Sequence, residues 1–215
     1  MSKPVIVMGA GGHARVLLDI LVLQRLELIG ITSADPHEYE HRVFGLSVIG
    51  PDELIFAYPV DAVSLVNGLG LMPGRYQRLY LYEKFKQHGY GFLSVMHPSA
   101  VVASDVKIRE GVQIMAGAII QTGTVLDENS IINTGAVVDH DSYIGKHVHL
   151  APGATVSGGV SIGERTFVGV GASIIQGIKI GVHCVVAAGA VVVRDLPDGA
   201  RAMGIPARVT RGRGY

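Results

Sequence analysis

The sequence predicts two domains, an α/β domain over residues 1–96 and a left-handed parallel β-helix over residues 97–215. Three observations support this prediction: a strand that leads through a glycine-rich turn into a helix near the N-terminus, a change of periodicity after His97-Pro98, and an unbroken six-residue repeat beyond that point. With 215 residues, of which 48% are hydrophobic, the chain is long enough to bury a core in each half.

The N-terminal half alternates short apolar runs with amphipathic segments. An apolar run over Val5–Met8 ends in the turn Gly9-Ala10-Gly11-Gly12-His13. The predicted elements that follow are a helix over residues 14–25, strands over residues 26–32 and 62–66, and a helix over residues 76–88 that Gly89 stops. A strand, a glycine turn, a helix and a second strand predict a Rossmann-like βαβ unit with a parallel sheet.

The C-terminal half repeats every six residues. Val, Ile or Leu stands at each sixth position from 102 to 192, which makes sixteen hexads, and glycine recurs three residues after many of these lead positions. Neither a helix nor an ordinary strand has a period of six. The pattern is typical of a chain wound around a triangular prism, in which each hexad forms one short face and one corner. Three hexads complete a coil, so residues eighteen apart stack roughly 4.8 Å from one another.

Composition and charge exclude several functional classes. Lys and Arg together number 18, as do Asp and Glu, so the formal charge is zero and does not favour nucleic-acid binding. Cys184 is the only cysteine, which excludes an intrachain disulfide and a cysteine-based zinc site. The first apolar run is too short for a signal peptide, and no stretch reaches the roughly 18 apolar residues of a membrane span. We therefore expect a cytoplasmic protein with no nucleic-acid or membrane partner.

One hexad carries a candidate acid–base pair. His140 lies two residues past the lead residue Val138, which places it on the outer surface, and Asp141 takes the corner position that is glycine in most hexads. Histidine is the usual general base near neutral pH, and a neighbouring carboxylate raises its basicity and fixes its tautomer. His149 lies half a coil from His140, so the two are expected on different sides of the prism and can share a site only between neighbouring copies.

The motifs, taken together, resemble a known family. They are residues 9–15 (Gly-Ala-Gly-Gly-His-Ala-Arg), residues 97–100 (His-Pro-Ser-Ala), residues 131–141, residues 149–153 and residues 204–208 (Gly-Ile-Pro-Ala-Arg). The chain resembles the hexapeptide-repeat acyltransferases, most of all the bacterial sugar N-acetyltransferases that act on UDP-, GDP- or dTDP-linked 4-amino-6-deoxy sugars. The related sialic acid O-acetyltransferases share this layout.

The resemblance implies an acetyl-CoA-dependent, metal-independent transfer to the 4-amino group of a nucleotide sugar, for surface polysaccharide or glycan synthesis. It also implies a homotrimer with acetyl-CoA between adjacent β-helices. By the same resemblance His140 is the base, Asp141 its activating carboxylate, and His149 a hydrogen-bonding partner near the thioester carbonyl. The further implied contacts are Asn133 on the acceptor side, and Gly158, Val170 and Ala188 along the pantetheine channel.

The N-terminal domain is expected to hold the nucleotide sugar. Backbone amides at a helix N-terminus bind phosphate groups, and the resemblance places the diphosphate on Gly11 and Gly12 with His13 as a further donor. Ser33 and Ala34 stand where the family carries acidic residues that contact the base or ribose. Asn67 ends the third predicted strand, at the edge of a parallel sheet where ligands bind.

Other functions remain open on the sequence alone. Sialic acid or other sugar O-acetylation uses the same layout, and a β-helix without catalytic function would be a binding protein. An NAD-dependent oxidoreductase would need a fuller glycine fingerprint and an acid where Ser33 and Ala34 stand. His147 and His183 share a corner column two coils apart, a spacing that would suit two ligands of a three-histidine zinc site. The third histidine would stand at position 188, which is Ala188, so both are interpreted as solvated histidines.

Overall fold

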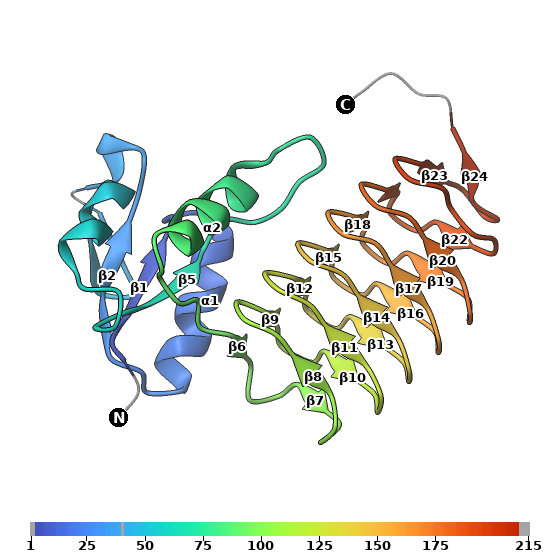
Figure 1. Cartoon of the computed structure of the whole chain (residues 1–215), viewed down its shortest axis with the longest axis horizontal. Coiled ribbons are helices and arrows are strands. Elements are labelled where there is room, and N and C mark those ends of the chain that lie inside the picture. The colour runs from blue at the N-terminus through green and yellow to red at the C-terminus, as the bar shows by residue number, and fades with distance from the viewer. Residues whose placement is uncertain (1–2, 40, 211–215) are drawn as a thin grey trace. The chain divides into compact units, whose positions relative to one another are not determined.

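A computed structural model describes residues 3–39 and 41–210, in which the chain forms two compact units (Figure 1). The first unit comprises the chain up to Leu71 together with Arg75–Pro98. The second combines Met72–Gly74 with the chain from Ser99 onward. The observed division after Pro98 lies close to the expected one, but the grouping of Met72–Gly74 with the repeats has no precursor in the sequence pattern.

A mainly parallel sheet forms the centre of the first unit. Its strands, in spatial order, are β3 (Arg42–Val43), β4 (Leu46–Gly50), β2 (Leu28–Thr32), β1 (Val5–Met8) and β5 (Ser64–Asn67). The interior strand β1 pairs in parallel with both β2 and β5 and is buried at every position. Such a buried parallel strand reads as a continuous apolar run, which is why the sequence located it. The predicted parallel βαβ arrangement is confirmed.

Helices complete the first unit. They are α1 (Gly12–Leu23), α2 (Gln77–Gln87) and the short 3₁₀ helices η1 (Pro36–Glu38) and η2 (Asp52–Ala57), and the last strand of the unit is β6 (Val95–Met96). Tyr82 and Phe85 of α2 are buried in a cluster with Ile6, Met8 and Leu65 of the sheet. None of the helices in the described parts of the chain combines the length and apolar character needed to cross a membrane.

The second unit is the predicted left-handed parallel β-helix, visible in Figure 1 as a stack of coils. Each hexad contributes one two-residue strand, and the register pairs residues eighteen apart, as in Ile119↔Val137 and His149↔Phe167. The strands divide among three faces. The first face holds β7 (Val101–Val102), β10 (Ile119–Ile120), β13 (Val137–Val138), β16 (Thr155–Val156), β19 (Ser173–Ile174) and β22 (Val191–Val192).

The other two faces continue the same register. The second face holds β8 (Lys107–Ile108), β11 (Val125–Leu126), β14 (Tyr143–Ile144), β17 (Ser161–Ile162) and β20 (Lys179–Ile180). The third holds β9 (Gln113–Ile114), β12 (Ile131–Ile132), β15 (His149–Leu150), β18 (Phe167–Val168), β21 (Val185–Val186), β23 (Arg201–Met203) and β24 (Arg208–Val209). All strands within the coils run parallel, and β24 closes the stack by pairing antiparallel with β23.

The interior of the prism is filled by the lead residues and by the side chains four positions later. Leu126, Ile144 and Ala154 are fully buried, whereas Ile108, on the terminal strand of its face, remains 38% exposed. Cys184 is also fully buried, and burial raises the pKa of its thiol. Cys184 thus points into the prism, and a buried protonated thiol is a poor nucleophile.

Candidate active site

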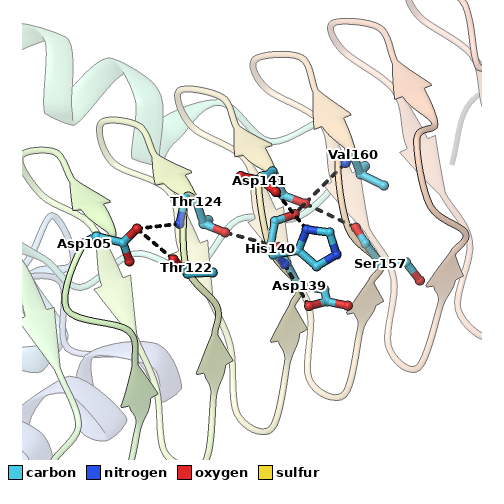
Figure 2. A network of polar contacts seen from close by, with 10 residues as sticks. Asp105, Thr122, Thr124, Asp139, His140, Asp141, Ser157 and Val160 are labelled. Atoms are coloured by element: carbon cyan, nitrogen blue, oxygen red, sulfur yellow. Dashed lines mark hydrogen bonds and ion pairs between the residues drawn. The ribbon is translucent and has the colours of Figure 1, made fainter.

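His140 and Asp141 lie in contact at the corner between β13 and β14 (Figure 2). The Nδ1 atom of His140 is 2.8 Å from Oδ2 of Asp141. The two side chains are 56% and 73% exposed, so the pair faces solvent. Because Asp141 engages Nδ1, Nε2 is the ring nitrogen that can exchange a proton with a substrate.

The backbone conformation of Asp141 brings its carboxylate to the imidazole. Its φ is +55°, in the left-handed region where the same corner of neighbouring coils carries Gly123 and Gly159. Aspartate is among the few non-glycine residues that adopt this conformation with modest strain. A carboxylate therefore occupies a corner that a glycine would form more easily.

Hydrogen bonds from the preceding coil hold this corner (Figure 2). The Asp141 N–H donates to the Thr122 carbonyl at 3.0 Å, and Thr124 Oγ1 donates to the Asp139 carbonyl at 3.2 Å. The His140 N–H in turn donates to Oδ1 of Asp139 at 2.8 Å. These contacts fix the backbone on both sides of the imidazole, so the ring is oriented before any substrate arrives.

The surrounding carboxylates make His140 more basic. Its pKa is raised above the usual value, first by the hydrogen bond to Asp141 and next by the negative charge of Asp139. A raised pKa means that His140 stays protonated to a higher pH than an ordinary histidine. A general base must be neutral to act, so activity that depends on His140 should fall as pH drops through this raised pKa.

Replacing Asp141 with asparagine should move the acid limb of the kcat–pH profile to lower pH, because the largest cause of the raised His140 pKa is removed. The high-pH plateau should fall by about tenfold or more, since the imidazole becomes a weaker and less well oriented base. Asp139→Asn is the matched control and should give a smaller shift in the same direction. A D141N profile superimposable on that of the wild type would contradict the assignment.

Asn133 and His149 come together on another face of the prism. Asn133 Nδ2 lies 3.1 Å from His149 Nε2, and the His149 ring meets the Phe167 ring edge-on with centroids 5.2 Å apart. His149 is 7% exposed and sits on β15, whereas His140 follows β13 on a different face. As expected from the sequence, one chain does not bring the two histidines to the same side.

Val170 and Ala188 line a common apolar cavity of about 330 Å³ in the second unit. Its wall is formed by Met72, Pro73, Phe167, Gly169, Val170, Val185, Val186, Ala187 and Ala188. Met72 and Pro73 were missed because a loop between two N-terminal elements carries no signal that it groups with distant repeats. Gly158 is not among these residues and lies instead one coil beyond His140.

A second cavity, of about 490 Å³, lies at the carboxyl ends of β1 and β2 in the first unit. Gly11, Ser33 and Ala34, which the sequence analysis assigns to substrate binding, line this cavity, and their role stays a prediction. Gly11 is the N-cap of α1 and has no side chain to cap the helix, so its first turn presents amides of the kind that bind phosphate. Gly12 and His13 are the first residues of that helix.

Two acidic side chains also line this cavity and had not been identified. Glu38 accepts a hydrogen bond from Ser33 Oγ at 2.5 Å, and Asp52 accepts one from Thr32 Oγ1 at 2.5 Å. Partial burial raises the pKa of Asp52. The cavity thus carries two carboxylates, although Ser33 and Ala34 stand where acidic residues were expected. They come from segments five and twenty residues away in sequence, which motif matching at the strand end does not reach.

Asn67 is buried rather than aimed into the cavity. Its Nδ2 donates to the Arg78 carbonyl at 2.9 Å, and its Oδ1 accepts from the Leu69 N–H at 3.3 Å. Arg78, itself buried, donates from one guanidinium nitrogen to the carbonyls of Asn67 and Leu69 at 2.8 and 2.6 Å. Burial lowers the pKa of Arg78 to about 9. In this arrangement the side chain of Asn67 shapes the loop that brings Leu69 to the cavity wall.

The two corner histidines differ from each other. His183 is exposed as expected, but His147 is 3% exposed and lies with its Nδ1 2.9 Å from Asn129 Nδ2, so its interpretation as a solvated residue is wrong. The neighbouring corner residue Asn129 is also buried, which the surface pattern of the hexads does not predict. Within residues 3–39 and 41–210, no three His, Cys, Asp or Glu side chains are grouped so as to hold a metal ion.

Family models match both units. The model described as the PglD N-terminal domain matches residues 4–72, and that described as the hexapeptide repeat of succinyl-transferase matches residues 159–194. A comparison with curated proteins found no match.

Several solved structures are similar along the whole chain. A variant of perosamine N-acetyltransferase from Caulobacter crescentus, in complex with CoA and GDP-perosamine, shares 39% identity over 98% of each chain, with a TM-score of 0.89. The acetyltransferase domain of PglB from Neisseria gonorrhoeae, in complex with acetyl coenzyme A, shares 31% identity over 98% of this chain and all of its own, with a TM-score of 0.89. WeeI from Acinetobacter baumannii shares 25% identity over 97% of this chain, with a TM-score of 0.84.

Proposed function

The chain belongs to the hexapeptide-repeat nucleotide-sugar N-acetyltransferases, and from this premise we propose that it transfers the acetyl group of acetyl-CoA to the 4-amino group of a nucleotide-linked 4-amino-6-deoxy sugar. The observation that carries the proposal is the His140–Asp141 contact on an exposed corner of the β-helix. This contact supplies an oriented base where two substrates can approach from solvent.

His140 acts as the general base in the proposed reaction. The neutral 4-amino group of the sugar attacks the thioester carbonyl, and Nε2 of His140 takes a proton from that nitrogen as the N–C bond forms. Asp141 accepts a hydrogen bond from Nδ1–H of His140 and stabilises the imidazolium that forms. When the C–S bond breaks, His140 returns the proton to the departing thiolate. The products are the N-acetylated sugar and CoA, and His140 is neutral again.

The apolar cavity beside Val170 and Ala188 is the proposed site of the pantetheine arm of acetyl-CoA. Small side chains on its wall allow the arm to approach the backbone closely. His149 and Asn133 lie on the same face as Phe167, which also lines the cavity, and are proposed to bind near the thioester and the acceptor. No metal ion is needed for this chemistry, because the thioester is already activated toward an amine.

The cavity of the first unit is the proposed site of the nucleotide. The amides at the start of α1 suit the diphosphate, and the carboxylates of Glu38 and Asp52 are hydrogen-bond acceptors for N–H groups of a base or hydroxyls of a ribose. A guanine edge presents two adjacent N–H donors, whereas uracil and thymine present one donor between two carbonyls. The carboxylates therefore favour a GDP-linked acceptor, as does the relative that holds GDP-perosamine.

A panel of GDP-, UDP- and dTDP-linked 4-amino-6-deoxy sugars, together with CMP-sialic acid and free sialic acid, tests this function. We expect acetyl-CoA-dependent release of free thiol with the 4-amino sugars, and at least about tenfold higher kcat/KM for the GDP-linked one, equivalent to roughly 1.4 kcal/mol of binding discrimination. Acetyl-CoA without acceptor is the control for hydrolysis. Turnover with sialic acid but with no 4-amino sugar would favour the alternative, a sugar O-acetyltransferase.

Three further properties belong to the proposal. We propose an oligomer with shared sites, because His140 and His149 lie on different faces of one prism and meet only if a neighbouring copy supplies one of them. The family resemblance makes this oligomer a homotrimer. We propose a cytoplasmic location, since both substrates are charged, soluble metabolites. An N-acetylated nucleotide sugar is an activated donor, so the product is proposed to enter surface polysaccharide or glycan synthesis.

A further inference from the structure

Gly158 lies directly against the imidazole of His140. The two residues are eighteen positions apart, one full coil, and the Gly159 N–H donates to the His140 carbonyl at 2.8 Å. A Cβ atom built on Gly158 would lie 2.5 Å from Nε2, 2.7 Å from Cε1 and 3.0 Å from Cδ2 of His140. The imidazole therefore occupies the volume that any other side chain at position 158 would fill.

The backbone at position 158 does not itself require glycine. Its φ lies outside the left-handed region, unlike that of Gly159 at +67°. The equivalent position of other hexads carries side chains of many sizes, among them Lys146, Pro152, Glu164, Val170, Gln176 and Arg194. The three atoms that an added Cβ would meet first all belong to the His140 ring. What excludes a side chain here is the histidine, and not the turn.

Asp141 has a similar neighbour on the opposite side. A Cβ on Gly123, one coil before Asp141, would collide with Oδ1 of the aspartate, although the φ of +73° at Gly123 disfavours substitution in any case. Each member of the pair thus rests on a glycine of an adjacent coil. Of these two glycines, Gly158 is the one whose backbone conformation would allow a side chain, so there it is the His140 ring alone that leaves no room for one.

We propose that Gly158 is a positioning residue for His140. The absence of a side chain at Gly158 leaves a space that the imidazole of His140 fills. In this position Nδ1 contacts Asp141 and Nε2 faces the acceptor. The expected effect on catalysis rests on the proposed function, but the packing of the His140 ring against Gly158 is a property of the free protein. It differs from a role along the pantetheine channel, which would act on acetyl-CoA binding.

The test is Gly158→Ala. The added methyl group would overlap the His140 ring, so the ring must turn out of this space and lose its hydrogen bond to Asp141. We expect kcat to fall by about ten- to a hundredfold, as displacements of about 1 Å in a reacting group do. The KM for acetyl-CoA should stay within about twofold, and a nuclear magnetic resonance titration of His140 should show its pKa falling toward the ordinary value as the Asp141 bond is lost. Gln176→Ala, which places the same side chain one coil further along the column, is the matched control and should change none of these quantities.

A double variant separates the two roles. If Gly158 acts through His140, then G158A should reduce turnover little further when added to His140→Ala. A raised KM for acetyl-CoA with unchanged kcat, or an equal further loss in the H140A background, would overturn the proposal. An unchanged titration of His140 in G158A would also overturn it. The titration needs no substrate, so it tests whether Gly158 positions His140 even if no nucleotide sugar proves to be acetylated.

Discussion

Replacing His140 with alanine should lower kcat by about 10²- to 10⁴-fold, the contribution of a well-placed general base. The attacking nitrogen must lose a proton as its bond to the acetyl carbon forms, and without an imidazole that proton passes to water. Because Nε2 acts only as the reaction proceeds, the KM for each substrate should change by no more than a few-fold. Steady-state kinetics with saturating acetyl-CoA and the best acceptor of the panel measure both quantities.

The matched control for this variant is His183→Asn. His183 is also an exposed histidine at a corner of the β-helix, with φ at +56°, a conformation that asparagine tolerates. This control should retain wild-type turnover. If the H140A variant worked at a near-normal rate while melting at the wild-type temperature, His140 would not be the base.

Mixing two inactive variants should restore activity. We expect His140→Ala and His149→Ala each to be strongly impaired, the second by at least about tenfold as expected for a lost hydrogen-bonding group near the thioester carbonyl. If each site takes His140 from one copy and His149 from its neighbour, random reassembly of an equal mixture makes about a quarter of the sites intact by simple counting. Turnover after dissociation and reassembly should therefore reach about a quarter of the wild-type value, well above either parent.

Each variant dissociated and reassembled alone is the control for the mixture. An independent measurement of mass, by light scattering or sedimentation, should show three copies before and after the treatment. If the mixture showed only the mean of the two parents, each chain would contain a complete site, and the shared-site trimer would be excluded.

The sequence predicted the β-helix in detail because its signal is periodic and long. The hexad leads at 102 to 192 are the second residues of β7 to β22, so every strand of the repeat was located. The prediction of β1, α1, β5 and α2 was also confirmed in kind, with bounds that differ by a few residues at most. The hairpin of β3 and β4 and the helix η2 were missed, because short elements at a sheet edge have little hydrophobic pattern of their own.

The candidate site was predictable where a local rule was broken. His140 was found as a histidine expected on the outer surface, and Asp141 beside it places a carboxylate at a corner that is glycine in most hexads. The structure shows the two side chains in contact, and their catalytic role stays a prediction. Glu38 and Asp52 were not found, because they reach the cavity through the fold and not through a motif. Gly158 had a signal that went unused: the eighteen-residue coil places it over His140, but only the side-chain geometry shows that the ring fills its space.

The uniform eighteen-residue register also shapes how the C-terminal unit forms. Nearly all contacts between coils join residues at the same separation along the chain, so folding requires many similar loop closures and no single long one. Once two coils have stacked, each further coil can fold by pairing with the exposed strands of the coil before it, so folding spreads along the axis of the β-helix. Such a molecule tolerates the gain or loss of a whole coil far better than of one residue. A shift of eighteen keeps every lead residue inside and on its own face, whereas a shift that is not a multiple of six turns lead residues out.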